Sequence, residues 1–214
     1  MSRDAVSGAS LVLGVIAGLV TMALHPAVLD HSGTPEQLAT VMRLNVVAHG
    51  LGIVAVALTF FGALGLARRL DDGPGLAVAG LVAYGFAAFA ATCAALANGL
   101  IAPALFEHLA DATDAERAAL GVVGDYSWFF NQAFAKLHVV ASSTAIALWS
   151  LVILRSRVLP RWLGVYGCVL GPVAILALFS GHLSLGLHGF GLVVLSQGVW
   201  LVSAGMRMWG MKRD

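Results

Sequence analysis

The chain has 214 residues, of which 59% are hydrophobic and 11% are charged, whereas about 25% of the residues in an ordinary soluble domain are charged. A soluble fold of this size could not bury so much apolar surface, so much of the chain must face lipid. The net charge of +1 excludes an electrostatic basis for nucleic-acid binding. The two cysteines, Cys93 and Cys168, both lie in apolar runs, so no disulfide framework is implied.

Six segments are long and apolar enough to cross a bilayer, which takes about 20 mostly apolar residues. They are residues 6–25, 44–67, 75–101, 127–154, 162–180 and 186–206. The first exceeds the apolar core of about 7–15 residues that is typical of a signal peptide, and no small-residue cleavage site follows it. The sequence therefore predicts an all-α fold. We expect a single integral membrane domain over residues 1–214, built as a six-transmembrane-helix bundle with short outer surface helices.

The basic residues are distributed unequally between the two sides of this predicted bundle. Nine of the twelve belong to one side: Arg3, Arg68, Arg69, Arg155, Arg157, Arg161, Arg207, Lys212 and Arg213. The opposite loops carry only Arg43 and Arg117, and Lys136 lies within a span. Arginine and lysine accumulate in cytoplasmic loops, so we expect both termini to be cytoplasmic. Loops 26–43 and 102–126 would then face outward. Little lysine and much alanine and glycine favour a bacterial chain, and hence the inner membrane.

Both predicted outer loops contain signals for the start of a helix. Thr34, Pro35, Glu36 and Gln37 form a capping box with proline at the first helical position, and this helix could run directly into the second span. A second capping box is formed by the four residues from Thr113 to Glu116. Because Gly121 is a plausible C-cap, the pattern predicts a short amphipathic helix on the outer surface.

Four histidines fall in one layer of the predicted bundle. His25, His49, His138 and His188 lie 17 to 22 residues along their spans from an arginine on the basic side. At about 1.5 Å per residue they are about 25–33 Å from that side, close to the outer boundary of a hydrocarbon core about 30 Å thick.

Imidazole is a common ligand of transition metals and of haem iron. We therefore predict that His49 and His138 are the axial ligands of haem b, with His188 and His25 as alternates. A transition metal ion held by His49, His138 and His188 is the variant of this prediction. Candidates for supporting the ligands, or for facing the same layer, are Asn45, Asn98, Asn131, Lys136 and Ser142.

A plainer interpretation applies to the same residues. Polar side chains are least costly at the membrane boundary, so these histidines could simply meet lipid headgroups. Lys136 could likewise be functional, as intramembrane lysines often are, or could extend its ammonium group to the outer surface.

Three functions follow from these observations. The first is a haem or metal protein of electron transfer, with a quinone as a redox partner. The second is a non-catalytic accessory or assembly subunit that binds a larger membrane protein, and the third is a permease for small molecules. No H-E-x-x-H, H-x-x-x-H, G-x-S-x-G or Walker motif occurs, so no enzyme class is assigned. The lipid bilayer is the one partner that all three share.

Overall fold

The computed structural model describes residues 2–25, 35–70, 75–110 and 112–210. All regular secondary structure in these ranges is helical, which confirms the predicted all-α class. The elements are α1 (Arg3–Leu24), α2 (Pro35–Arg69), α3 (Leu76–Leu96), the π-helix η1 (Ala97–Ile101), α4 (Ala102–Ala110), α5 (Asp114–Ser156), α6 (Arg161–Phe179) and α7 (Leu187–Gly210).

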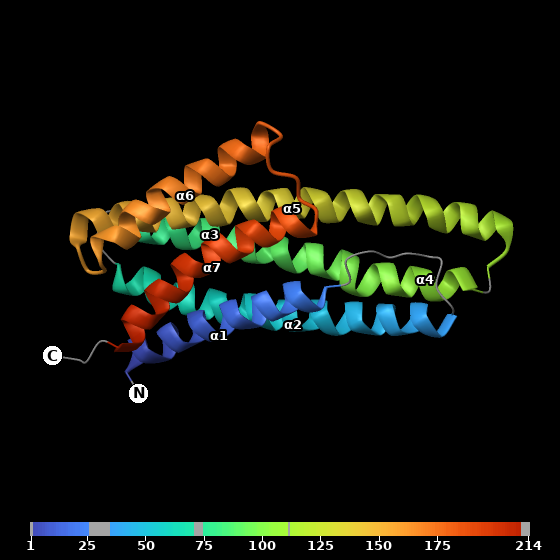
Figure 1. Ribbon diagram of the computed structural model, residues 1–214, viewed down its shortest axis with the longest axis horizontal. Coiled ribbons are helices and arrows are strands. Elements are labelled where there is room, and N and C mark those ends of the chain that lie inside the picture. Colours follow the sequence, from blue (N-terminus) through green and yellow to red (C-terminus); the bar gives the residue numbers. More distant parts are fainter. Residues whose placement is uncertain (1, 26–34, 71–74, 111, 211–214) are drawn as a thin grey trace.

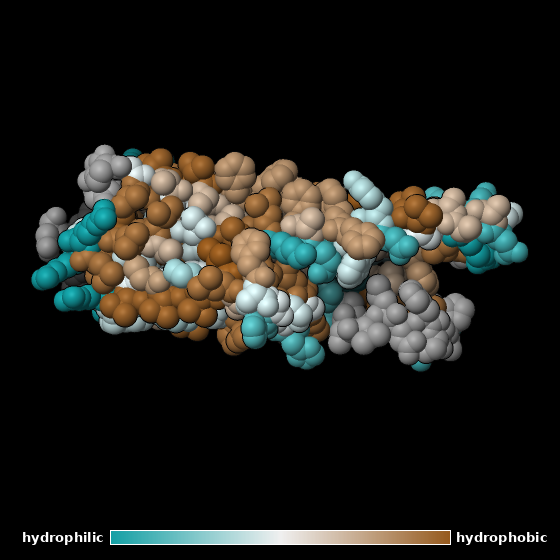
Figure 2. Space-filling view, turned by 90° about the horizontal axis from the view of Figure 1, so that it is seen from above, coloured by the Kyte–Doolittle hydropathy of each residue, from teal (hydrophilic) through white to brown (hydrophobic). Residues whose placement is uncertain are grey.

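Six helical segments of the described chain are long and apolar enough to cross a membrane, and each coincides with one predicted span to within a residue or contains it. They are α1, α2, α5, α6, α7 and the continuous helix formed by α3, η1 and α4. Hydrophobic side chains cover the middle of the molecule in Figure 2, whereas hydrophilic side chains gather at its left end and at its right-hand tip. The chain is therefore a multi-pass membrane protein.

The helices form two groups that share one long contact. Helix α1 packs along both α2 and α7, while α5 packs along both α3 and α6, and the contact of α2 with α3 joins the groups. Both termini lie at the same end of the bundle (Figure 1). We call this end, where Arg3, Arg68, Arg155 and Arg207 lie, the arginine end, and the opposite one the far end.

Helices α2, α4 and α5 extend past α1, α6 and α7 at the far end (Figure 1). Helix α5 has 43 residues and is therefore about 64 Å long, about twice the thickness of a hydrocarbon core. Helix α2 has 35 residues, and α3 continues through η1 into α4. The predicted outer loops are thus largely extensions of membrane helices.

One sequence prediction is wrong here. The capping box at Thr113 is present, because the Thr113 hydroxyl accepts from the Glu116 N–H and the Glu116 carboxylate accepts from the Thr113 N–H. The helix does not end at Gly121, however, but continues to Ser156 as α5. Packing of α4 on α5 supports this stretch, and tertiary contacts commonly override the weak helix propensity of glycine. In the first outer loop, α2 begins at Pro35 as expected, whereas Thr34 lies outside the described residues.

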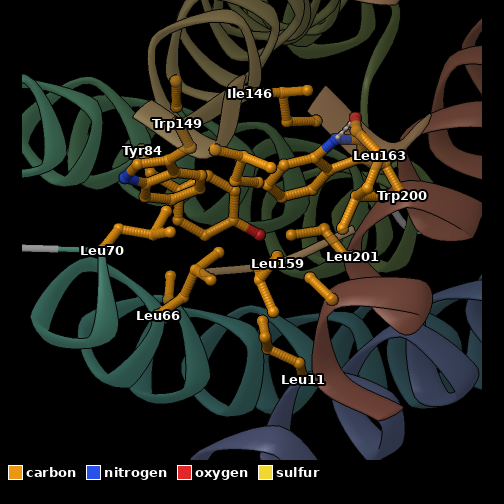
Figure 3. Packing of buried hydrophobic residues seen from close by; sticks show 14 of the residues in the cluster. Leu11, Leu66, Leu70, Tyr84, Ile146, Trp149, Leu159, Leu163, Trp200 and Leu201 are labelled. Carbon is orange, nitrogen blue, oxygen red and sulfur yellow. Dashed lines mark hydrogen bonds between the residues drawn. The ribbon is translucent and has the colours of Figure 1, made fainter. Parts of the chain in front are cut away.

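Two stacked tryptophans form the centre of the hydrophobic core (Figure 3). The rings of Trp149 and Trp200 are 6.1 Å apart and nearly parallel, and both residues are fully buried. The indole N–H of Trp149 donates to the carbonyl of Ala77 in α3, and that of Trp200 donates to the carbonyl of Leu163 in α6. Each tryptophan therefore fastens its own helix to a neighbour with a directed bond, which apolar packing alone does not provide.

Membrane orientation is the first testable expectation. In a chain whose Cys93 and Cys168 are replaced by serine, we expect an impermeant maleimide to label the T113C variant in intact cells and to leave the S2C variant unlabelled until the cells are opened. The basic residues at the arginine end predict this result, because arginine and lysine accumulate in cytoplasmic loops. Labelling of S2C alone would invert the orientation. Labelling of both in intact cells would contradict an even number of spans.

Candidate functional site

A cavity of about 370 Å³ lies between α1, α2, α3, α5 and α7. Sites for small molecules measure about 300–1,000 Å³, so its volume suits a small ligand. Polar side chains from all five helices face it: Thr21, His25, His49, Thr59, Tyr84, Asn98, Asn131, Gln132, His138 and Gln197. No aspartate, glutamate, lysine or arginine of the described ranges lines it.

The cavity occupies the part of the bundle where α1 ends and α7 begins. His25 is the C-cap of α1, and Leu187 is the first residue of α7. Tyr84 and Leu201 belong both to its lining and to the tryptophan-centred core. The core therefore closes the cavity on the side of the arginine end.

Much of the remaining wall is made of residues with little or no side chain. They are Gly14, Gly18, Gly52, Ala55, Ala91, Ala94, Ala95, Ala135, Gly186 and Gly198. Glycine at these positions also permits close helix contact, since a Cβ on Gly14 would lie 2.7 Å from the backbone nitrogen of Thr59 in α2.

His49 is 7% exposed and is fixed by its own helix and by η1. Its Nδ1 lies 2.8 Å from the carbonyl oxygen of Asn45, one turn earlier. A carbonyl can only accept, so Nδ1 carries the proton and Nε2 keeps a lone pair. The side chain packs on the backbone of η1, where a Cβ added to Gly99 would lie 2.6 Å from Cγ of His49.

The ring of His49 also contacts the ring of His25. The two centroids are 4.9 Å apart, and the planes are inclined at 63°. Two of the histidines that the sequence placed in one layer are therefore direct neighbours, on α1 and α2.

His138 is held in the same tautomer by a different helix. Its Nδ1 lies 3.0 Å from the carbonyl oxygen of Ala87 in α3, so this nitrogen donates and Nε2 accepts. The ring packs beside Phe190 of α7, with 5.6 Å between the centroids. Because its partners come from α3 and α7, the orientation of this ring depends on three helices.

The π-helix η1 forms part of the cavity wall and is stabilised by side chains from its neighbours. Asn45 of α2 donates from Nδ2 to the carbonyl of Asn98 at 2.6 Å. From α5, Asn131 donates to the carbonyl of Ala94 and Ser127 donates to that of Ala97. A π turn interrupts the regular α-helical hydrogen bonds, and such turns are frequent at functional sites.

The sequence proposed Asn45, Asn131 and Ser142 as hydrogen-bond partners of the histidine rings. In the structure their side chains have other partners. The amides of Asn45 and Asn131 donate to backbone carbonyls of η1 and α3. The Ser142 hydroxyl donates to the backbone carbonyl of His138. Asn45 does support His49, but through its main-chain oxygen.

The other candidates separate into those inside and those outside the cavity. His25 and Asn98 line it, whereas His188 and Lys136 are exposed and do not. The prediction that Lys136 extends its ammonium group to the outer surface requires an exposed side chain, and Lys136 is exposed.

Five polar residues of the cavity were missed by the sequence reasoning: Thr21, Thr59, Tyr84, Gln132 and Gln197. Gln197 is 5% exposed and donates from Nε2 to the Ser143 hydroxyl at 3.0 Å, and Gln132 donates from Nε2 to Oδ1 of Asn131 at 3.3 Å. The signal that could have identified the two glutamines is their occurrence inside apolar spans, where polar side chains are costly.

The metal prediction is not supported by this geometry. No group of three or more histidine, cysteine, aspartate or glutamate side chains that could hold a metal ion occurs in residues 2–25, 35–70, 75–110 and 112–210. The direct contact of the His25 and His49 rings also leaves no room for a porphyrin between these two. Haem bound by His49 and His138 stays a prediction.

A second hollow, of about 430 Å³, lies at the arginine end and has a different character. Its lining includes Arg3, Arg68 and Arg69, and the carboxylate of Asp4 lies 3.5 Å from the Arg69 guanidinium. The charged side chains of this second hollow therefore lie apart from the uncharged cavity.

The contact between η1 and His49 can be tested with two glycine variants. We expect G99A to lower the thermal unfolding midpoint in detergent, because overpacking typically costs about 1–3 kcal/mol and the added methyl group would meet the His49 side chain. Gly121 in α5 has no atom within 4 Å of the same position. The control variant G121A should therefore leave the midpoint unchanged or raise it. Equal midpoints for the two variants would show that η1 does not hold His49.

No family model, curated protein or solved structure matches this chain. Its function is therefore argued from the cavity and from the residues that line it.

Proposed function

We propose that this membrane protein binds a small uncharged molecule in the cavity between α1, α2, α3, α5 and α7. The observation that carries the proposal is the combination of volume and lining: about 370 Å³ between five helices, with ten polar side chains that reach it and none of them an acid, a lysine or an arginine. A largely apolar pocket with a few convergent polar groups is the usual form of a small-molecule site.

The absence of acidic and strongly basic side chains from the described lining defines the class of ligand. A charge moved from water into an apolar site is costly unless an opposite charge or several hydrogen bonds compensate it. The titratable groups that could supply such a charge are the histidines, and the Nδ1–H groups of His49 and His138 already donate to backbone carbonyls. A neutral ligand requires no such compensation.

The depth of the cavity supports access from the far side of the membrane. His49 and Arg68 belong to one unbroken helix, as do His138 and Arg155. Their separations of 19 and 17 residues correspond to about 25–29 Å of rise, which is nearly the full thickness of a hydrocarbon core. A ligand could therefore reach the cavity from the outer leaflet without crossing the bilayer.

Binding is favoured over a continuous permeation path in this conformation. Trp149 and Trp200 fill the bundle between the cavity and the arginine end, and both are fully buried. A permease would have to move these stacked rings or use a different route.

The redox and accessory-subunit predictions remain open to separate measurements. A Soret band or bound metal in the purified protein would support the redox function, and elemental analysis would detect colourless ions.

The accessory-subunit alternative has its best support in Tyr126, Trp128 and Phe129 of α5, which are 56–68% exposed. Aromatic side chains are also enriched at the membrane interface without any partner, so these residues favour the two interpretations equally.

The proposal is tested by filling the cavity. Gly18 lines the cavity, and a Cβ at this position would have only Ala55 Cβ, at 4.0 Å, near it, so we expect the side chain of G18L to occupy part of the cavity. Gly50 is exposed on α2 and has nothing within 4 Å, which makes G50L the matched control.

Three uncharged probes of similar shape serve as ligands: tetramethylhydroquinone, its dimethyl ether and tetramethylbenzoquinone. Binding is measured by calorimetry on the purified protein. We expect at least one probe to bind the wild type and G50L alike, and G18L to bind it about tenfold more weakly, a loss of about 1.4 kcal/mol. If no probe binds the wild type, or if G18L binds as well as G50L, the cavity is not the site of binding.

A further inference from the structure

We infer that the ligand of this cavity is a hydrogen-bond donor: an uncharged ring that bears hydroxyl groups and is bound through the Nε2 atoms of His138 and His49. The inference rests on the proposed function and specifies its ligand. It follows from the hydrogen bonds that the lining residues make within the protein. These bonds determine which donor and acceptor groups remain for a ligand.

The two histidines can only accept. The Nδ1–H of His138 is used by the carbonyl of Ala87, and that of His49 is used by the carbonyl of Asn45. A neutral imidazole has one donor and one acceptor. The atom that each ring has left is therefore the unprotonated Nε2.

The threonine hydroxyls of the lining are also acceptors. Thr21 donates to the carbonyl of Ala17 at 3.0 Å, and Thr59 donates to the carbonyls of Ala55 and Val56 at 2.9 and 3.0 Å. Each hydroxyl has a single proton, so only oxygen lone pairs remain for a ligand.

The amide groups supply donors to the cavity. Asn131 and Gln197 each use one N–H on a partner inside the protein, the Ala94 carbonyl and the Ser143 hydroxyl, so a second N–H remains on each. Asn98, Gln132 and Tyr84 also line the cavity and carry further N–H and O–H groups. The described lining therefore offers both donors and acceptors, whereas the rings of His49 and His138 offer acceptors alone.

The two imidazole acceptors distinguish a hydroxyl-bearing ring from its carbonyl form. A hydroxyl group can donate to Nε2 and still accept from an amide N–H. A carbonyl group can only accept, so it would leave without a partner any imidazole nitrogen that the ligand itself covers from water, which is unfavourable. Sites built to pair with a hydroxyl group strongly reject analogues that lack it.

The three probes of the previous section test this inference, because they share one ring and differ in donors. Under argon, we expect tetramethylhydroquinone to bind the wild-type protein about tenfold more tightly than the dimethyl ether or the quinone. In H138F, which retains a flat ring without one of the two acceptors, the dissociation constant of the hydroquinone should rise toward that of the ether. Binding of the ether should not change, which also reports that the variant is folded.

H188F is the matched control, because His188 is exposed and lies outside the cavity lining; it should bind all three probes as the wild type does. Equal affinities of the three probes for the wild type, or tightest binding of the quinone, would overturn the hydroxyl class and leave binding in the cavity intact. Failure of every probe to bind the wild type would overturn the proposed function as well.

Discussion

In a hydrocarbon environment the backbone must satisfy its own hydrogen bonds, and this constraint determines where the cavity of this protein can form. The chain meets it with regular helix almost throughout the described residues, and departs from regular helix at η1. There the carbonyl of Asn98 receives the side-chain amide of Asn45, while the main-chain oxygen of Asn45 receives the ring of His49. One asparagine thus supports both an irregular turn and a cavity residue, so the cavity wall and its histidine are positioned together.

The need to satisfy polar groups also explains why one end of the bundle is filled and the other contains a cavity. Toward the arginine end, indole N–H groups donate to carbonyls of neighbouring helices, and the space between the helices is filled. Toward the far end, small residues replace large ones in the lining, and polar side chains share the remaining space. A closed core and an open cavity therefore follow from side-chain volume along helices that are otherwise continuous.

The sequence predicted the features that depend on distance along the chain and missed those that depend on direction. Span number follows from composition, and the common depth of the four histidines follows from counting residues. Whether a residue faces the cavity depends on the rotation of its helix, and for this reason His188, at the same expected depth as His49, is exposed on the surface instead. No residue type in the sequence indicates the π turn. Gly121 indicated the end of a helix, but α5 continues through it, and α4 packs on α5.

The glycine and alanine wall has a thermodynamic consequence for any ligand. Side chains with rotatable bonds lose conformational entropy when a ligand immobilises them, whereas glycine and alanine have no such freedom to lose. Helix backbone at Gly18, Gly52 and Ala95 instead presents a fixed surface to the ligand. Discrimination among ligands of similar polarity would then come from the rigid shape of the main chain, which adjusts little, and an ill-fitting molecule could not be accommodated by a change of rotamer there.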